Sequence, residues 1–144
     1  MGKKRIVTKS SGGVDAEIKK RSLTRLTKKK LTEGVVYVQS TYNNTKLLLT
    51  DKKGNALAWT TSGSLGFKGA RKGTPFAASK VAELLIEKAG IIGIKSVDIV
   101  VRGVGAGRES SIRTIASKGI EILSIKDVTP VPFNGPRPKK PRRV

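Results

Sequence analysis

The last fifteen residues of the chain, Pro130 to Val144, read PVPFNGPRPKKPRRV and cannot form a folded unit on their own. They contain five of the six prolines in the sequence, five Lys or Arg residues and no acidic residue. Proline fixes φ and has no backbone N–H to donate, so this segment should run extended and present its cations to an anionic partner. The folded part of the chain must therefore end before Pro130.

Positive charge is concentrated at both ends of the chain. The sequence has 30 Lys plus Arg against 10 Asp plus Glu, a net charge of +20. Residues 1–33 hold 11 basic and three acidic residues, so this segment and the tail together carry +13 of the +20. A free domain of this size usually lies within several charges of neutrality, because self-repulsion opposes compaction. The charge therefore favours a polyanionic partner, and nucleic acid is the leading candidate.

The composition excludes several classes of function. The chain has no Cys and no His, so it lacks a disulfide framework, thiolate metal ligands and the commonest general base. It also lacks an apolar run long enough to cross a bilayer, and its N-terminus lacks the apolar stretch of a signal peptide. We expect a soluble, non-secreted protein with no metal, no cofactor, no small-molecule substrate and no membrane partner.

Charge and apolar content divide the chain into three parts. Residues 1–33 form a basic N-terminal arm, residues 34–129 suffice for a single α/β nucleic-acid-binding domain, and residues 130–144 form the proline-rich tail. Residues 15–30 of the arm have two interpretations: a helix formed against a partner, or a solvated charged stretch.

Strands dominate the first part of the domain. Three runs rich in β-branched, aromatic and leucine residues are separated by short turn segments. Asn43 and Asn44 form the first predicted turn, because Asn tolerates the positive φ that a tight two-residue turn requires. Residues 51–55 form the second turn. The pattern predicts three antiparallel strands, at Val35–Tyr42, Thr45–Thr50 and Ala56–Thr61.

Helices and strands alternate in the rest of the domain. Thr74, an N-cap residue, and Pro75, at the first helical position, predict a helix that ends near Ala89 with Gly90 as its stop. Helical crossovers between strands imply parallel pairing, so we predict an α/β fold with a mixed five-stranded sheet and helices packed on it. The other predicted elements are a strand at Ile94–Arg102, a helix at Arg108–Lys118 and a strand at Ile120–Val128.

Two glycine-rich loops precede the predicted helices, at Ser62–Gly73 and Gly103–Gly107. Glycine lets a backbone approach phosphate, and a helix N-terminus offers unpaired N–H groups. Neither loop has P-loop register, and the second reads G-x-G-x-G without the acidic residue that grips a ribose, so a nucleotide cofactor site is rejected. The loops could instead be flexible turns with solvated cations. We favour cations that face a nucleic-acid backbone: Lys68, Arg71 and Lys72 at the first loop, and Arg102, Arg108 and Arg113 at the second.

Catalytic chemistry has few candidates. Seven acidic residues are spread over residues 34–129, whereas a two-metal nuclease needs several carboxylates at one site. A serine nucleophile without histidine would need a lysine base, and no S-x-x-K motif lies in a plausible setting. The sequence therefore predicts no catalytic residue and no enzyme.

Aromatic residues are scarce, so a sheet that stacks nucleic-acid bases is not predicted. Tyr37 and Trp59 lie on predicted strands and are expected in the core. Phe67 lies in the basic loop, where it could wedge against a base or anchor the loop to the domain.

Four segments carry a family resemblance: GVVYVQSTYNNT at Gly34–Thr45, GFKGARKGTPFAA at Gly66–Ala78, VRGVGAGRES at Val101–Ser110, and DVTPVPFNGPRPKKPRRV at Asp127–Val144. In this order they resemble the bacterial small-ribosomal-subunit proteins of the S-eleven family, over nearly the whole chain. The resemblance implies a three-layer α/β/α fold with ribonuclease-H-like topology, no catalysis, and a place on the platform of the small subunit. It also implies contacts with several helices of 16S ribosomal RNA (rRNA) and with small-subunit proteins seven and eighteen.

The resemblance further implies a place beside the cleft for the Shine-Dalgarno helix of the messenger RNA (mRNA), and a link to initiation factor three. The expected location is a cytoplasmic ribosome, with an organellar ribosome as the other setting. Phe133 and Pro136 depart from the family, which commonly has histidine and cysteine there, but the Asn134–Gly135 turn and Arg137 remain. The residues that we predict to bind rRNA are Asn43, Asn44, Lys68, Arg71, Lys72, Arg102, Arg108, Arg113, Asn134, Arg137, Lys139, Lys140, Arg142 and Arg143.

Two other functions would use some of the same features. A free nucleic-acid-binding or architectural protein would carry the same charge, and sedimentation with the small subunit at high salt distinguishes it from a ribosomal protein. A metal-dependent nuclease on the implied fold would need the carboxylate cluster that the sequence lacks.

Overall fold

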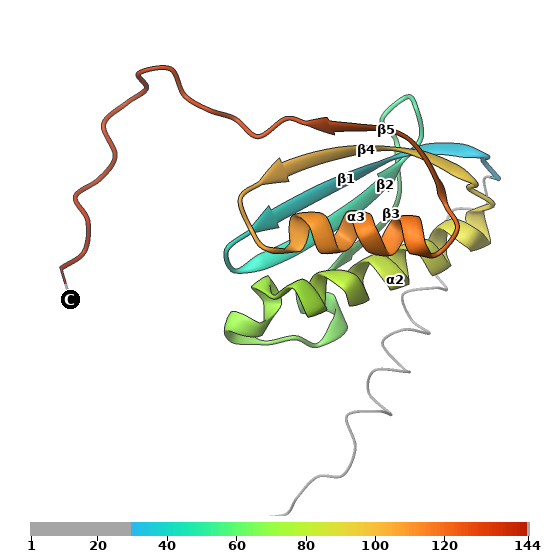
Figure 1. Cartoon of the computed structure of the whole chain (residues 1–144), viewed down its shortest axis with the longest axis horizontal. Coiled ribbons are helices and arrows are strands. Elements are labelled where there is room, and N and C mark those ends of the chain that lie inside the picture. Colours follow the sequence, from blue (N-terminus) through green and yellow to red (C-terminus); the bar gives the residue numbers. More distant parts are fainter. Residues whose placement is uncertain (1–29, 144) are drawn as a thin grey trace, which may run out of the picture.

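A computed structural model describes residues 30–143, which form a mixed five-stranded sheet and two α-helices (Figure 1). The α/β class and the five strands confirm the prediction from the sequence. Residues 15–30, for which the sequence left a helix and a solvated stretch open, lie almost entirely outside the described residues. In chain order the elements are β1 (Glu33–Thr41), β2 (Asn44–Thr50), β3 (Ala56–Thr61), the 3-10 helices η1 (Gly63–Leu65) and η2 (Gly69–Gly73), α2 (Pro75–Ile92), β4 (Ser96–Gly103), α3 (Gly107–Ser117) and β5 (Glu121–Asp127).

The sheet has the strand order β3-β2-β1-β4-β5. β1, β2 and β3 pair antiparallel as two consecutive hairpins, whereas β4 is parallel to β1 and β5 is parallel to β4. Only β2 therefore runs against the other strands. This order and these directions agree with the ribonuclease-H-like topology that the resemblance implied.

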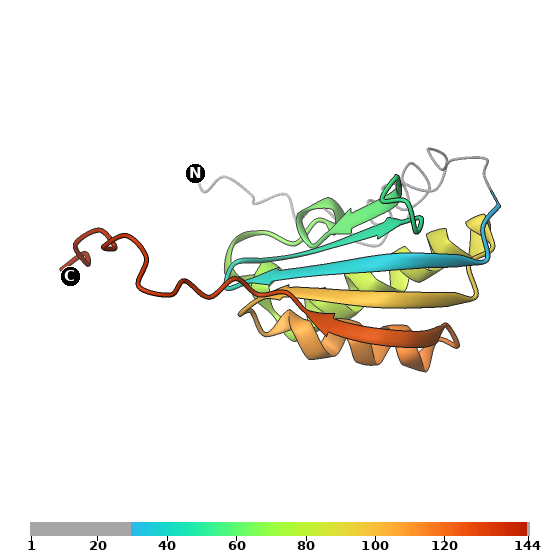
Figure 2. The same ribbon diagram turned by 90° about the horizontal axis from the view of Figure 1, so that it is seen from above.

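The described residues make two layers, not the three that the resemblance implied. Figures 1 and 2 show α2 and α3 side by side on the same face of the sheet. The parallel strands β1, β4 and β5 advance in one direction across the sheet, and right-handed crossovers in one direction place every helix on one face. We call the opposite side of the sheet the open face, because no helix of the described residues covers it.

The core lies between the sheet and the two helices. Alternate residues of the central strands face the helices and are buried, as Val36 and Val38 of β1 and Val97, Ile99 and Val101 of β4 show. The helices contribute further buried side chains to the same cluster: Val81, Ala82, Leu85, Ala89 and Ile92 from α2, and Ile115 from α3.

Lys88 is a charged side chain in this otherwise apolar layer. It is 6% exposed, and its Nζ donates a hydrogen bond to the Trp59 carbonyl oxygen at 2.9 Å. Burial lowers the pKa of its ammonium group. The contact ties the edge strand β3 to α2.

The first turn lies one residue earlier than predicted. β1 ends at Thr41 and β2 begins at Asn44, so Tyr42 and Asn43 form the turn, and the Thr41 hydroxyl accepts a hydrogen bond from the Asn44 amide at 3.1 Å. Among the described non-glycine residues only Asn134 has a positive φ. The expectation of a positive φ at Asn43 or Asn44 is therefore wrong.

The predicted end of the first helix is also wrong. α2 continues through Gly90 to Ile92 and stops at Gly93, which has φ 98°. The N–H groups of Gly93 and Ile94 both donate to the Ala89 carbonyl oxygen, at 2.9 and 3.0 Å. Because Ile92 is fully buried, its packing extends the helix past a glycine that the sequence alone suggested as its stop.

Candidate nucleic-acid interface

One edge of the sheet gathers the loops for which the sequence predicts RNA contacts. β1, β3, β4 and β5 all run in one direction, so their carboxyl ends meet at one edge, as the arrowheads of β1, β4 and β5 in Figure 1 show. The β1–β2 turn, residues 62–74 and residues 103–107 lie there, and the C-terminal tail leaves from it. We call this the loop edge. In α/β sheets with parallel strands, the carboxyl ends are the usual place for ligands.

Glycines let the two loops pack directly against the β1–β2 turn. A Cβ at Gly73 would overlap the Tyr42 carbonyl oxygen, and a Cβ at Gly105 would overlap that of Thr41. The Gly105 N–H also donates to the Ser40 carbonyl oxygen at 3.0 Å. Packing already requires glycine at these positions, so its presence is not evidence that they approach a phosphate.

Asn44 joins the turn to the start of the basic loop. Its Oδ1 accepts a hydrogen bond from the Ser62 hydroxyl at 2.5 Å, and the Ser62 amide donates to the Thr45 carbonyl oxygen at 3.0 Å. Asn43 is exposed at the tip of the turn. Asn44 thus has an internal partner, whereas Asn43 presents its side chain to solvent.

The basic loop is held against the start of α2. Lys68 and Arg71 are exposed and Lys72 is half-buried. The Phe67 ring packs edge-to-face on Phe76, with centroids 6.1 Å apart and an interplanar angle of 83°. Of the two roles considered for Phe67, this contact supports the loop anchor.

The predicted cap at the start of α2 is confirmed. The Thr74 hydroxyl accepts a hydrogen bond from the Ala77 amide at 3.3 Å, and Pro75 occupies the first helical position. The cap satisfies one of the N–H groups at this helix end and leaves Lys68 and Arg71 as the exposed charges beside it.

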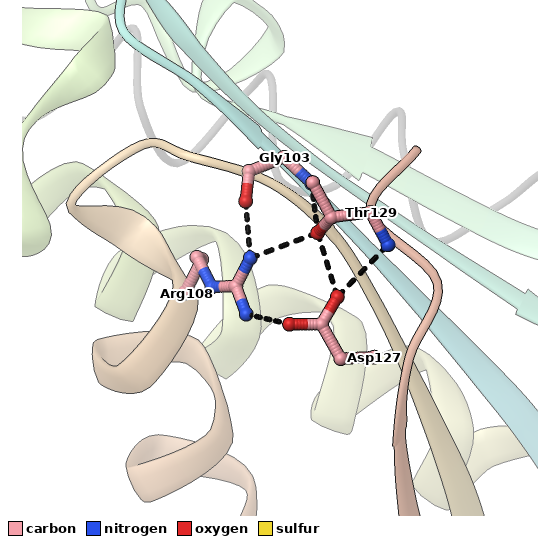
Figure 3. Close-up of polar contacts among 4 residues, drawn as sticks. All are labelled: Gly103, Arg108, Asp127 and Thr129. Carbon is pink, nitrogen blue, oxygen red and sulfur yellow. Dashed lines mark hydrogen bonds and ion pairs between the residues drawn. The ribbon is translucent and has the colours of Figure 1, made fainter. Parts of the chain in front are cut away.

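Arg108 clamps the exit of the tail (Figure 3). Its Nη1 donates to the Gly103 carbonyl oxygen and, at 3.0 Å, to the Thr129 hydroxyl, and its Nη2 forms an ion pair with Asp127. The Thr129 hydroxyl and amide donate in turn to Asp127 Oδ1, at 2.6 and 2.9 Å. The start of α3, the end of β4 and the residues after β5 are thereby joined. We call these four residues the exit clamp.

The exit clamp sets the charge of its carboxylate. Hydrogen bonds from the Thr129 hydroxyl, the Arg108 guanidinium and the Thr129 amide lower the pKa of Asp127 to about 2. The carboxylate therefore stays ionised throughout the physiological range. The Arg108 guanidinium already has three internal partners, so the structure gives it a role in the fold. An RNA contact by Arg108 remains a prediction.

The other two cations of the second loop point to opposite sides of the domain. Arg102 is exposed on the open face, where it lies opposite Gln39 of β1, and Lys46 of β2 lies opposite the same Gln39. Arg113 is exposed on α3, which packs on the other face. The three arginines thus do not form one cluster.

Sequence reasoning missed Lys46, which lies across β1 from Arg102 with Gln39 between them. The alternation of residues along β1 and β2 could have placed both cations on the face that carries Gln39. It also missed that Tyr37 and Trp59, expected in the core, are 40% and 57% exposed on that face.

The C-terminal tail has neither helix nor strand between residues 128 and 143, as its prolines predict. Asn134 has φ 56°, and the chain bends there, as the predicted turn at Asn134–Gly135 would require. Phe133, one of the two positions at which the tail departs from the resemblance, is 97% exposed. The five cations of the tail are all exposed: Arg137, Lys139, Lys140, Arg142 and Arg143.

Residues 30–143 contain no group of His, Cys, Asp or Glu side chains that could hold a metal ion. A helix long and apolar enough to cross a membrane is likewise missing from this part of the chain.

The sequence model of a protein family described as "Ribosomal protein S11" matches residues 34–143. The match begins at the first strand, runs through the sheet, both loops and both helices, and includes nearly all of the tail. Proteins of this family have a structural role in the small ribosomal subunit and are not enzymes. Because the match covers most of the sequence, this chain belongs to the ribosomal protein S11 family.

Proposed function

We propose that this protein binds and bridges several helices of 16S rRNA on the platform of a bacterial small subunit and helps to form the Shine-Dalgarno cleft. The observation that carries the proposal is the convergence of the β1–β2 turn, both glycine-rich loops and the cationic tail at the loop edge. A surface fed by three separate chain segments and a tail can contact RNA elements that are distant in the RNA sequence. Its mechanism is neutralisation and positioning of phosphates, with no chemical step.

The three parts of the chain have different roles in this proposal. The domain, residues 34–129, docks by the loop edge, while the arm, residues 1–33, and the tail, residues 130–144, fill grooves between RNA helices. Asn134 shapes the tail where it leaves the domain, and the five cations after it enter the RNA. This division explains why +13 of the +20 charge lies outside the domain.

The proposed neighbours are small-subunit proteins seven and eighteen, with initiation factor three and the Shine-Dalgarno region of the mRNA as functional partners. The family supports rRNA and ribosomal neighbours in general. The proposed location is a bacterial cytoplasmic ribosome.

The salt dependence of rRNA binding tests the role of the tail. Each phosphate contact contributes about 0.9 or less to the slope of log affinity against log salt. Replacement of the five tail cations, Arg137, Lys139, Lys140, Arg142 and Arg143, by alanine should therefore lower the slope for a platform rRNA fragment by up to about 4.5. Filter binding between 50 and 300 mM KCl measures it.

Lys53 and Lys95 supply the matched control, because both are exposed at the edge of the sheet opposite the loop edge. Their replacement by alanine should change the slope little per charge removed. An equal change per charge in the two variants would show that only overall charge matters. Failure of the chain to sediment with the small subunit at high salt would favour the free nucleic-acid-binding protein instead.

A further inference from the structure

The open face carries an apolar row that crosses four strands. Trp59 of β3 lies opposite Leu48 of β2, Leu48 opposite Tyr37 of β1, and Tyr37 opposite Val100 of β4. Trp59 is 57% exposed and Tyr37 is 40% exposed. Two aromatic rings and two aliphatic side chains thus share one solvent-facing row, and exposed apolar surface of this kind marks an interaction site.

A polar row with two cations runs beside the apolar row. Its members are Thr61, Lys46, Gln39 and Arg102, again paired strand to strand. Lys46 and Arg102 flank Gln39, and both are exposed. The rows are two residues apart along each strand, which is about 7 Å. Between them lies a groove of about 320 Å³, whose lining includes Tyr37, Gln39, Lys46, Leu48, Val100 and Arg102.

One carboxylate of the open face, that of Asp98, lies beyond the apolar row, on the side away from the polar row. Asp98 precedes Val100 by two residues on the open face, and its Oδ1 accepts a hydrogen bond from the Ser124 hydroxyl at 2.5 Å. The apolar row therefore separates Asp98 from Lys46 and Arg102. The polar row lies next to the loop edge, because β4 ends one residue after Arg102.

We propose that the open face binds a single-stranded segment of RNA, with its bases stacked on Tyr37 and Trp59 and its phosphates held by Lys46 and Arg102. Base faces are accessible only in unpaired RNA, so the aromatic row favours a loop or bulge over a duplex. The cations complement phosphates along the neighbouring row. The inference rests on the proposed function for the identity of the RNA as rRNA, but single-strand binding can be measured without it.

Trp59 is the single tryptophan of the chain, so its fluorescence reports binding at this face directly. Titration of the full chain with a single-stranded RNA of about ten nucleotides should quench it by stacking. The Tyr37→Ala variant should bind about tenfold more weakly, the loss expected for one stacked base. The Lys46→Ala and Arg102→Ala variants should each lower the salt slope by about 0.7.

Ile91→Ala is the control, because Ile91 is 58% exposed but lies on α2, which covers the other face of the sheet. It should quench like the unchanged protein. Circular dichroism spectra that match the unchanged protein confirm that each variant is folded. A Tyr37→Ala variant with unchanged affinity, or Trp59 fluorescence insensitive to the RNA, would overturn the inference.

Crosslinking in the assembled subunit tests which molecule covers the face. A photoreactive p-benzoylphenylalanine in place of Leu48 should crosslink to RNA, and a crosslink to protein alone would refute the assignment. The two proposals fail separately. If single-stranded RNA quenched Trp59 in the unchanged protein but the platform rRNA fragment did not bind, only the proposed function would be contradicted. If the fragment bound but single-stranded RNA did not quench Trp59, only the open-face site would be contradicted.

Discussion

Asp127 shows how one side chain can fix the direction of a long tail. The tail has no regular hydrogen-bonded structure of its own, so its path is set where it leaves β5. There Asp127 receives two hydrogen bonds from Thr129 and pairs with Arg108 of α3. Because a tail that leaves in a fixed direction has less conformational freedom to lose on binding, the exit clamp should raise its affinity for RNA.

Asp127→Asn should release the tail without unfolding the domain. The variant keeps the shape of the side chain but loses the ion pair, so the Thr129 amide should exchange its hydrogen faster and the affinity for rRNA should fall about three- to tenfold. Hydrogen exchange and binding at fixed salt measure the two effects. Glu121→Gln, the same charge change at the exposed start of β5, is the control. Removal of one negative charge by itself favours RNA binding, so Glu121→Gln should not weaken it. An affinity of Asp127→Asn no lower than that of Glu121→Gln would contradict a role for the exit clamp.

The exit clamp also predicts how acid acts on the tail. The folded pKa of Asp127, about 2, lies below the usual value of about 3.9 for an unfolded Asp. Its contribution to stability is therefore complete above about pH 4 and is lost as the pH falls towards 2. Protection of the Thr129 amide, measured relative to its intrinsic exchange rate at each pH, should be lost in the unchanged protein only over that interval. Loss of this protection already at pH 5 would show that the carboxylate is not held as the structure indicates.

At the scale of elements, local sequence determines the strands and helices, while spatial neighbours determine their ends and surroundings. The β-branched runs and the Thr74–Pro75 cap predict all five strands and the start of α2, because those signals are local. The predicted helix end at Gly90 is wrong because α2 is extended by the burial of Ile92, and that burial depends on residues distant in the sequence. Likewise, the alternation of side chains along β1 places Tyr37 and Val36 on opposite faces of the sheet. Only the direction of the helical crossovers decides which of these faces the helices cover.

Two glycine substitutions with opposite expected signs test this distinction. Gly105→Ala places a Cβ against the Thr41 backbone and should destabilise the domain by about 1–3 kcal/mol through overpacking. Gly90→Ala places a Cβ in open space within α2 and should stabilise it by about 0.5–1 kcal/mol, through helix propensity. Urea unfolding measures both. Stabilisation by Gly105→Ala would show that the second loop does not pack on the β1–β2 turn.

The net charge of the whole molecule means that folding and RNA binding respond to salt in opposite ways. Even if each of the 10 acidic residues paired with a cation, 20 cations would remain. Between 0.1 and 1 M salt the Debye length falls from about 10 to 3 Å, so repulsion among them is screened. The same screening weakens contacts with RNA.

The melting temperature of the free protein should therefore rise with salt by several degrees, while the affinity for RNA falls. An exposed ion pair such as Lys80–Glu83 contributes about 0–1 kcal/mol, so its screening cannot offset the relief of repulsion among so many cations. Calorimetry in 0.1 and 1 M NaCl measures the rise. The variant that lacks the five tail cations should show a smaller rise, because it begins with less repulsion. A melting temperature that falls with salt in both proteins would mean that ion pairs, not repulsion, dominate the electrostatics of the free chain, and RNA would then be needed for placement but not for stability.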